Sequence, residues 1–161
     1  MSQPIRDRIV GFLRDIGIPV REDQLPDATF LPGIAVERGG LVFDPDKLAY
    51  PGDLLHEAGH LAIVPQAERG QLDADVGGDA GQEMAAIAWS YAALVYLDLP
   101  LEVVFHPAGY KGDSSALCEN FTHGHYIGVP ILEWRGLTDY QRPGASTSQN
   151  RYPAMKKWLC D

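Results

Sequence analysis

The sequence is poor in cysteine and in basic residues. Its only two cysteines, Cys118 and Cys160, lie far apart in the chain, so no disulfide framework is indicated. Two reduced thiols in a cytoplasmic protein are the better interpretation. Lys and Arg number 13 against 22 Asp and Glu, which gives a net charge of −9. Without a basic stripe to neutralise phosphates, the composition argues against direct binding to nucleic acid.

Long apolar runs are absent as well, so no membrane attachment is expected. The longest run, from Met84 to Leu97, is interrupted by Ser90 and is too short to span a bilayer. The first four residues, MSQP, provide neither the basic nor the apolar region of a signal peptide. The remaining composition is that of an ordinary globular protein, with 45% apolar and 22% charged residues. We therefore predict one domain spanning residues 1–161.

Histidine is also scarce, but its placement is informative. Two of the five histidines, His56 and His60, fall in the segment PGDLLHEAGHLAI at residues 51–63. Histidines four apart on a helix lie on one face, so both rings can reach a single metal ion. Glu57, beside the first ligand, is then placed to bond the metal's water rather than the metal. The alternative interpretation is a pair of surface histidines on an amphipathic helix.

Two further residues of this helix bear on its surroundings. The helix is predicted to begin near Pro51 and to end at Pro65. Asp53 lies in the first turn, where the helix dipole favours negative charge. Gly59 costs a helix about 1 kcal/mol relative to alanine. Its missing side chain allows another backbone or a substrate to approach closely.

The chain before this helix predicts another helix and a hairpin. Residues 4–16 carry apolar side chains at helical spacing. Residues 34–36 and 41–43 are β-type runs around residues 37–40 (ERGG), whose glycines are expected to supply positive φ in a turn. Three prolines interrupt residues 19–32, so this stretch is predicted to be irregular.

The chain after it contains a third candidate ligand. Residues 80–97 are apolar nearly all round, which predicts a buried helix with Glu83 at its start. One interpretation leaves Glu83 in solvent, in a first turn favoured by the helix dipole. The other makes it a metal ligand, because it follows His60 by 23 residues, enough for a loop and a return. A catalytic zinc takes three protein ligands and keeps a fourth position open. If Glu83 is not a ligand, the next candidates are Asp73, Asp75 and Asp79.

The C-terminal third offers candidate donors for an oxyanion. Residues 121–126 (FTHGHY) contain His123, His125 and Tyr126. Zinc peptidases usually need a His, Tyr or Arg donor to hold the oxyanion of the tetrahedral intermediate. His125 is our candidate, with His123 as a substitute and Tyr110 and Tyr126 as weaker alternatives. The other interpretation is a polar turn without a catalytic part.

The remaining C-terminal segments carry no assigned chemistry. Short elements are predicted at residues 101–104 and 114–121. Residues 141–150 are polar and rich in helix breakers, which predicts a flexible connection. The last residues are predicted to dock on the body of the protein through Tyr152, Met155 and Trp158; the alternative is that these three form a partner-binding patch.

Taken together, the hairpin, the segment LLHEAGHLA, a variable loop and the helix QEMAAIAWSYAAL resemble the ImmA/IrrE family of gluzincin-like metallopeptidases. The resemblance covers about residues 30–100. It implies an α+β, zincin-like core in which a small sheet packs on the metal helix and on a second buried helix. It also implies His56, His60 and Glu83 as ligands of one Zn²⁺ and Glu57 as general base. Members of this family act on protein partners, often transcriptional repressors.

One position departs from the pattern of related enzymes. Larger thermolysin-like gluzincins carry an aspartate four residues after the ligand glutamate, where it orients the first histidine. Ile87 occupies that position here, so a partner for His56 must come from elsewhere. In zinc peptidases of this architecture the edge of the sheet pairs with an extended substrate, which makes the predicted hairpin of functional interest.

Three functions are compatible with these residues. The first is a zinc-dependent metallopeptidase that hydrolyses a peptide bond in a cytoplasmic protein or peptide. The second is a zinc-binding regulatory or interaction module without turnover, and the third is a zinc hydrolase of a small amide or ester. Glu57 favours hydrolysis, because a purely structural zinc site needs no base and usually fills its fourth position with a side chain. Peptide and small-amide substrates both fit these residues.

Overall fold

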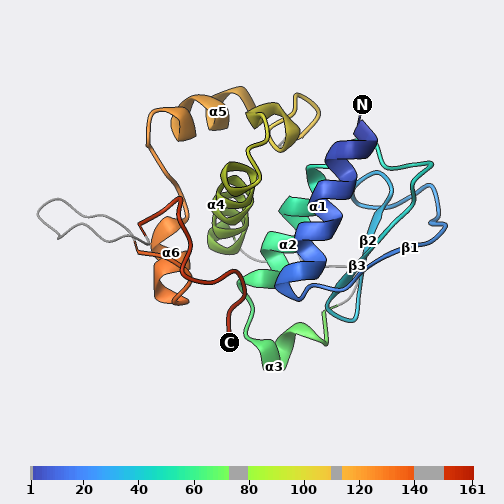
Figure 1. The fold of residues 1–161 in the computed structure, drawn as a ribbon, viewed down its shortest axis with the longest axis horizontal. Coiled ribbons are helices and arrows are strands. Elements are labelled where there is room, and N and C mark those ends of the chain that lie inside the picture. Colours follow the sequence, from blue (N-terminus) through green and yellow to red (C-terminus); the bar gives the residue numbers. More distant parts are fainter. Residues whose placement is uncertain (1, 73–79, 110–113, 140–150) are drawn as a thin grey trace, which may run out of the picture.

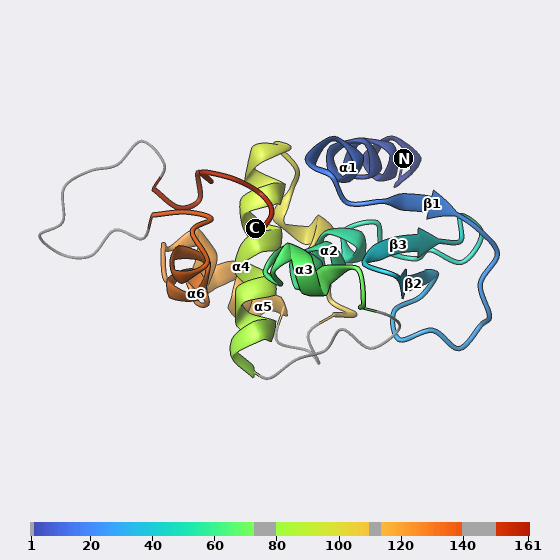
Figure 2. The same ribbon diagram turned by 90° about the horizontal axis from the view of Figure 1, so that it is seen from below.

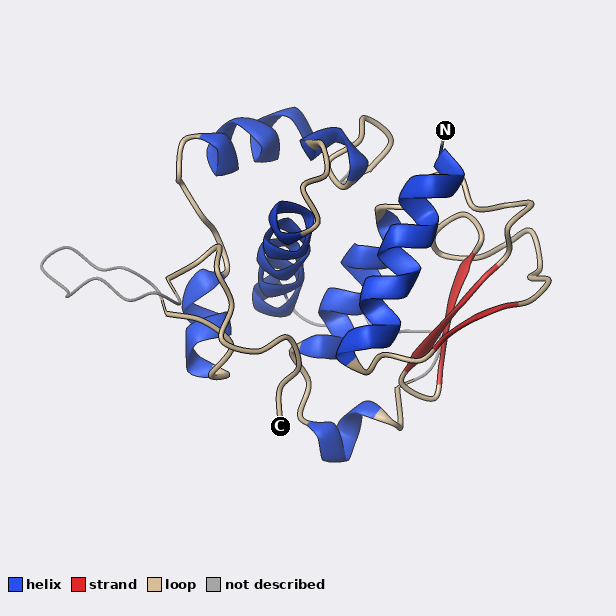
Figure 3. Cartoon of the chain, viewed as in Figure 1, coloured by secondary structure: helices blue, strands red, loops and turns tan. Residues whose placement is uncertain are grey.

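The computed structural model describes residues 2–72, 80–109, 114–139 and 151–161, and it is an α+β fold (Figure 1). A small sheet lies at one side of the molecule and helices form most of the rest (Figure 3). The predicted α+β class is therefore confirmed. The expected flexible connection at residues 141–150 lies outside the described residues. In chain order the elements are α1 (Ser2–Ile16), β1 (Val20–Glu22), β2 (Ile34–Glu37), β3 (Gly40–Phe43), α2 (Asp53–Ala62), α3 (Gln66–Arg69), α4 (Ala80–Tyr96), the 3₁₀ turn η1 (Leu101–Val103), α5 (Ser114–Thr122) and α6 (Val129–Trp134).

The sheet has three strands in the order β1-β3-β2. The predicted hairpin is confirmed: β2 and β3 are antiparallel, with Val36 opposite Leu41. Strand β1 pairs in parallel with β3, with Val20 also opposite Leu41. The prediction that residues 19–32 are irregular is therefore wrong for residues 20–22. A three-residue strand carries too short a pattern to be recognised, and its partner is distant in the sequence.

The hairpin turn contains only two residues, and both have positive φ. Arg38 has φ 49° and Gly39 has φ 76°, as a two-residue type I′ turn requires. The prediction that glycines supply this conformation is confirmed for Gly39 and wrong for Gly40, which belongs to β3. Position 39 also lacks room for a side chain, because a Cβ there would lie 2.4 Å from the carbonyl oxygen of Arg69.

Helices α2 and α4 lie side by side at the centre of the molecule (Figures 1 and 2). Every residue of α2 is buried, and α4 is buried from Ala85 to Leu94 apart from Tyr91. They approach closely at Gly59, where a Cβ would lie 2.7 Å from the carbonyl oxygen of Ala86. The missing side chain of Gly59 therefore admits a second backbone, which is one of the two roles expected for it.

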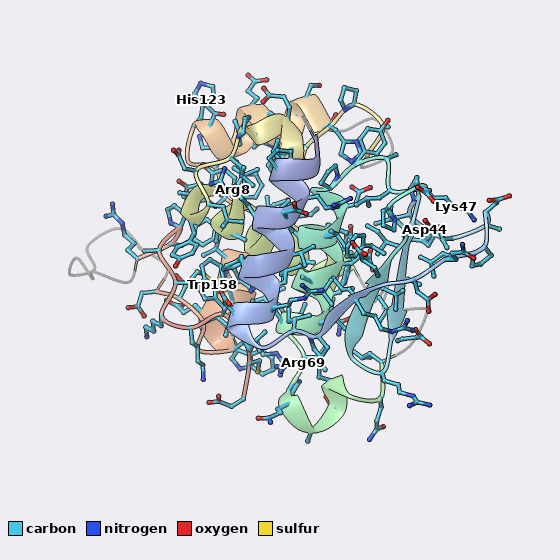
Figure 4. All side chains as sticks on the ribbon, turned by 45° about the vertical axis from the view of Figure 1, so that its right-hand side comes forward. Arg8, Asp44, Lys47, Arg69, His123 and Trp158 are labelled. Atoms are coloured by element: carbon cyan, nitrogen blue, oxygen red, sulfur yellow. The ribbon has the colours of Figure 1, made fainter. Side chains whose placement is uncertain are left out.

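The C-terminal residues dock on helices α4 and α1, as predicted for Tyr152 and Trp158. The buried Tyr152 hydroxyl donates to the carbonyl oxygen of Ala88 at 2.7 Å. The ring of Trp158 packs edge-on against Phe12 of α1, with ring centroids 5.0 Å apart, and Figure 4 shows it beside α1. The chain therefore ends against the helices that carry the candidate site.

Both cysteines are free, in agreement with the sequence prediction. Within the described residues, no helix combines the length and the apolar character needed to cross a membrane.

Candidate metal centre

His56, His60 and Glu83 meet in the structure. The Nε2 atom of His56 lies 3.1 Å from Oε1 of Glu83, and the Nε2 atom of His60 lies 2.8 Å from Oε2. The two imidazole rings are 4.9 Å apart between centroids and nearly perpendicular. Each residue offers one ligand atom, and all three ligand atoms lie within 4.8 Å of one another. The spacing predicted from the sequence therefore corresponds to a compact group in space.

The helix packing explains why these side chains converge. The histidines are one helical turn apart on α2, so both rings lie on the same face. The contact between Gly59 and Ala86 brings α4 against that face. Glu83 precedes Ala86 by one helical turn, which places its carboxylate at the histidine rings. Two local patterns and one glycine contact are sufficient to assemble the group.

The three residues fit a zinc ion. Bonds of about 2.0–2.1 Å to nitrogen and oxygen in a tetrahedral site place neighbouring ligand atoms about 3.4 Å apart. The two His–Glu distances, which involve different oxygens of the Glu83 carboxylate, are about 0.3 and 0.6 Å shorter than that. Imidazole nitrogen with carboxylate oxygen is also a usual donor set for zinc. Among the described residues, the group contains three candidate ligands and no fourth.

Exposure is uneven across the site. The side chains of His56 and His60 are 10% and 4% exposed, whereas that of Glu83 is 44% exposed. The site therefore faces solvent on the Glu83 side and is closed on the side of α2.

Glu57 is buried next to this group but is not part of it. Burial raises the pKa of its carboxyl, while the nearby imidazoles of His56 and His60 oppose that rise and the carboxylates of Glu83 and Asp53 reinforce it. A carboxylate that takes up and releases a proton at neutral pH needs a raised pKa. The environment of Glu57 therefore suits a general base.

The imidazoles and Glu83 stabilise one another electrostatically. Hydrogen bonds from His56 and His60 hold the pKa of the Glu83 carboxyl well below its usual range. Burial lowers the pKa of His56, but the hydrogen bond and charge of Glu83, together with the charges of Glu57 and Asp53, outweigh burial, so the net shift is upward. Glu83 is consequently an anion at neutral pH, as a metal ligand must be.

Asp53 and His106 form a second polar contact beside this site, which was not expected from the sequence. Asp53 and His106 are both 6% exposed, and Nε2 of His106 lies 2.7 Å from Oδ1 of Asp53. The only role expected for Asp53 was an interaction with the helix dipole, and the contact with His106 adds a second one. Its position three residues before His56 was an available signal, but nothing local in the sequence connects it to His106.

Three of the oxyanion candidates, His123, His125 and Tyr126, follow α5 in the described part of the chain. His125 is exposed on the turn after α5, where its backbone N–H donates to the carbonyl oxygen of Asn120 at 2.8 Å. Its ring neighbours that of His123, which lies at the outer edge of the molecule in Figure 4. Tyr126 packs against Tyr152. His123 and His125 do not belong to the ligand group found among the described residues, and the role of His125 as oxyanion donor stays a prediction.

The remaining positions named from the sequence have a simpler status. Ile87 is buried, so the position of the missing aspartate is filled by an apolar side chain. Tyr110, and the alternative ligands Asp73, Asp75 and Asp79, lie outside the described residues.

Comparison of the chain with protein-family models, with curated proteins and with solved structures finds no match in any of the three. The class of site therefore rests on its own geometry: an α+β fold in which two histidines and a glutamate converge beside a buried glutamate.

Proposed function

We propose that the protein is a zinc-dependent metallopeptidase of the ImmA/IrrE type, which hydrolyses a peptide bond in a cytoplasmic protein or peptide. The observation that carries this proposal is the convergence of His56, His60 and Glu83 next to the buried Glu57. A purely structural zinc site would need neither the open position nor the base. The free thiols of Cys118 and Cys160 agree with a reducing compartment.

Each residue has a role in this proposal. The histidines hold the ion through Nε2, and Glu83 holds it through a carboxylate oxygen. Bound zinc would polarise a substrate carbonyl and bring the pKa of a water molecule toward neutrality. Glu57 accepts the proton of the attacking water and passes it to the leaving amine, for which its raised pKa is suited. Its position next to His56 keeps it near the ion without binding it.

The edge of the sheet supports a peptide substrate over a small amide. The backbone N–H of Asp44 donates to the carbonyl oxygen of Gly33 at 2.9 Å. Hydrogen-bonded and non-hydrogen-bonded residue pairs alternate along an antiparallel ladder, so this bond fixes which residues of β2 bond to β3. The backbone N–H and C=O of Val36 then face away from β3, and within the described part of the chain nothing bonds them. Helix α2 packs on this strand. An extended peptide could therefore add to β2 beside the metal helix. A transcriptional regulator is the kind of protein partner that the family resemblance implies.

Metal analysis tests the site. Purified protein should contain about one zinc per chain, and the double variant His56→Ala with His60→Ala should contain none. Zinc retained by the double variant would show that the site is assigned to the wrong residues.

Turnover is tested separately with Glu57→Gln. We expect this variant to bind zinc like the wild type but to cleave a library of internally quenched peptides at least about 100-fold more slowly. Equal cleavage by both proteins would exclude Glu57 as the base. Zinc binding without cleavage of any peptide by the wild type would favour the non-catalytic zinc module.

A further inference from the structure

The buried contact between Asp53 and His106 joins the metal helix to the C-terminal third of the chain. Asp53 is the first residue of α2, and His106 follows η1, outside the region of about residues 30–100 that the family resemblance covers. Both side chains are buried, and the atoms in contact are 2.7 Å apart. Burying a carboxylate is costly unless it is paired, so this contact calls for a reason.

His106 is held from several sides. Its ring stacks on Tyr50 with a centroid separation of 3.8 Å and an interplanar angle of 8°. Gly109 leaves room for the ring edge, since a Cβ there would lie 3.1 Å from Cε1 of His106. Just before it, η1 presses on the start of α2: a Cβ at Gly52 would lie 1.8 Å from the carbonyl oxygen of Val103. The imidazole is therefore fixed in position against Asp53.

The pair retains a negative charge. With Asp53 ionised, Nε2–H of His106 donates to it, and Nδ1 of His106 is buried without a partner among the described residues. A second proton on the ring would place an unsatisfied N–H at Nδ1, which is costly in a buried position. A neutral His106 with an ionised Asp53 avoids that cost. Burial raises the pKa of Asp53, and the hydrogen bond from His106 opposes the rise.

This charge lies close to a candidate ligand. Asp53 and His56 are three residues apart on α2, so they lie on the same side of the helix. The two groups attract each other electrostatically. In thermolysin-like gluzincins an aspartate four residues after the ligand glutamate orients the first histidine, and here the buried Ile87 occupies that position. Asp53 is a buried carboxylate that can take over this task.

We propose that Asp53, held in place by His106, is a positioning residue whose negative charge acts through His56 to strengthen metal binding. This inference rests on the proposed zinc site. It makes the C-terminal segment part of that site, although the segment supplies no ligand. Partners that orient and polarise a ligand histidine typically contribute about 10–100-fold to metal affinity.

The test is the zinc dissociation constant, measured near neutral pH by competition with a chromophoric chelator. Asp53→Asn keeps the shape and can still accept the hydrogen bond from His106, but it removes the charge. We expect it to bind zinc about 10–100-fold more weakly than the wild type. Asp15→Asn is the matched control, because it removes one exposed carboxylate from another helix, α1, and should leave the affinity unchanged.

Two substitutions of His106 separate positioning from general stability. His106→Phe can keep the stacking on Tyr50 but cannot bond Asp53, so zinc affinity should fall in the same direction. His106→Gln restores an N–H donor and should recover part of the affinity. Because both residues act through one carboxylate, the double variant Asp53→Asn with His106→Phe should be no weaker than the weaker single variant. A purely structural role would lower thermal stability without this pattern of dissociation constants.

The outcomes are distinguishable. A folded Asp53→Asn protein that binds zinc as tightly as the wild type overturns this inference and leaves the zinc site intact. A wild-type protein that binds no zinc overturns the proposed function and this inference with it. If Asp53→Asn does not fold, His106→Phe decides: unchanged affinity overturns the inference, and weakened affinity restored by His106→Gln supports it.

Discussion

Gly59→Ala tests whether the close approach of α2 and α4 is what brings the metal ligands together. A Cβ at position 59 would lie 2.7 Å from the carbonyl oxygen of Ala86 and 3.1 Å from its Cα. Ordinary van der Waals contact begins at 3.4 Å, so the two backbones must separate by several tenths of an ångström. Glu83 lies one turn before Ala86 on the same helix. It should therefore move away from His60 when the helices separate.

Two opposing contributions set the size of the effect on stability. Alanine is a better helix former than glycine by about 1 kcal/mol. Forcing extra atoms into a packed interior costs about 1–3 kcal/mol. We therefore expect the free energy of unfolding of the metal-free Gly59→Ala protein to fall by up to about 2 kcal/mol. Metal affinity should fall too, because binding constellations tolerate displacements of only about 0.5 Å.

Gly11→Ala is the matched control for this experiment. Gly11 lies in α1, and a Cβ there would meet nothing within 4 Å. This variant should gain up to about 1 kcal/mol from helix propensity alone, with unchanged zinc affinity. Urea unfolding of the metal-free proteins and zinc competition titrations measure both quantities. If Gly59→Ala is stabilised as much as Gly11→Ala and binds zinc like the wild type, helix contact at Gly59 does not position Glu83.

Three further predictions concern single side chains. Glu83→Ala should lose zinc binding in competition titrations, and unchanged affinity would mean that another carboxylate completes the site. The guanidinium of Arg69 (Figure 4) donates to carbonyl oxygens at the end of α2 and in the C-terminal segment. Arg69→Gln should therefore lower the free energy of urea unfolding by about 1–3 kcal/mol. An unchanged value would show that these hydrogen bonds do not stabilise the fold. Asp44 accepts hydrogen bonds from the backbone N–H groups of Leu25 and Asp46, which lower the pKa of its carboxyl below the ordinary value of 3.8. The stabilising effect of the carboxylate is therefore present above pH 3.8 and is lost as pH falls through the lowered pKa. Asp44→Asn should therefore reduce the urea midpoint near neutral pH but progressively less in acid, and an equal reduction at both pH values would contradict this origin.

Much of the secondary structure and the ligand geometry could be predicted from local patterns. The helix that carries His56 and His60 is indicated by its period and by the prolines around it. The buried character of α4 follows from a run of apolar residues with Glu83 as the carboxylate of its first turn. Such patterns are readable because helical periodicity and turn residues act over a few neighbouring positions.

The sheet was only partly predictable, because one of its pairings is not local. The hairpin of β2 and β3 is joined by two residues, and its turn is visible in the sequence. Strand β1 contains three residues and depends on a parallel partner about twenty positions away. Its three residues form a strand only when paired with β3, so the prolines were the stronger local signal in residues 19–32 and predicted an irregular stretch.

The sequence by itself determined which residues can bind a metal and which one can act as a base, since those properties belong to residue type and helical spacing. Only the tertiary structure decided what surrounds them. In the folded chain Gly59 contacts Ala86, and Glu83 lies against the imidazoles. Asp53 is buried against His106, which comes from a distant part of the chain. The physical reason is that packing contacts and burial depend on the whole fold, whereas ligand chemistry and helical periodicity are already present in a short segment.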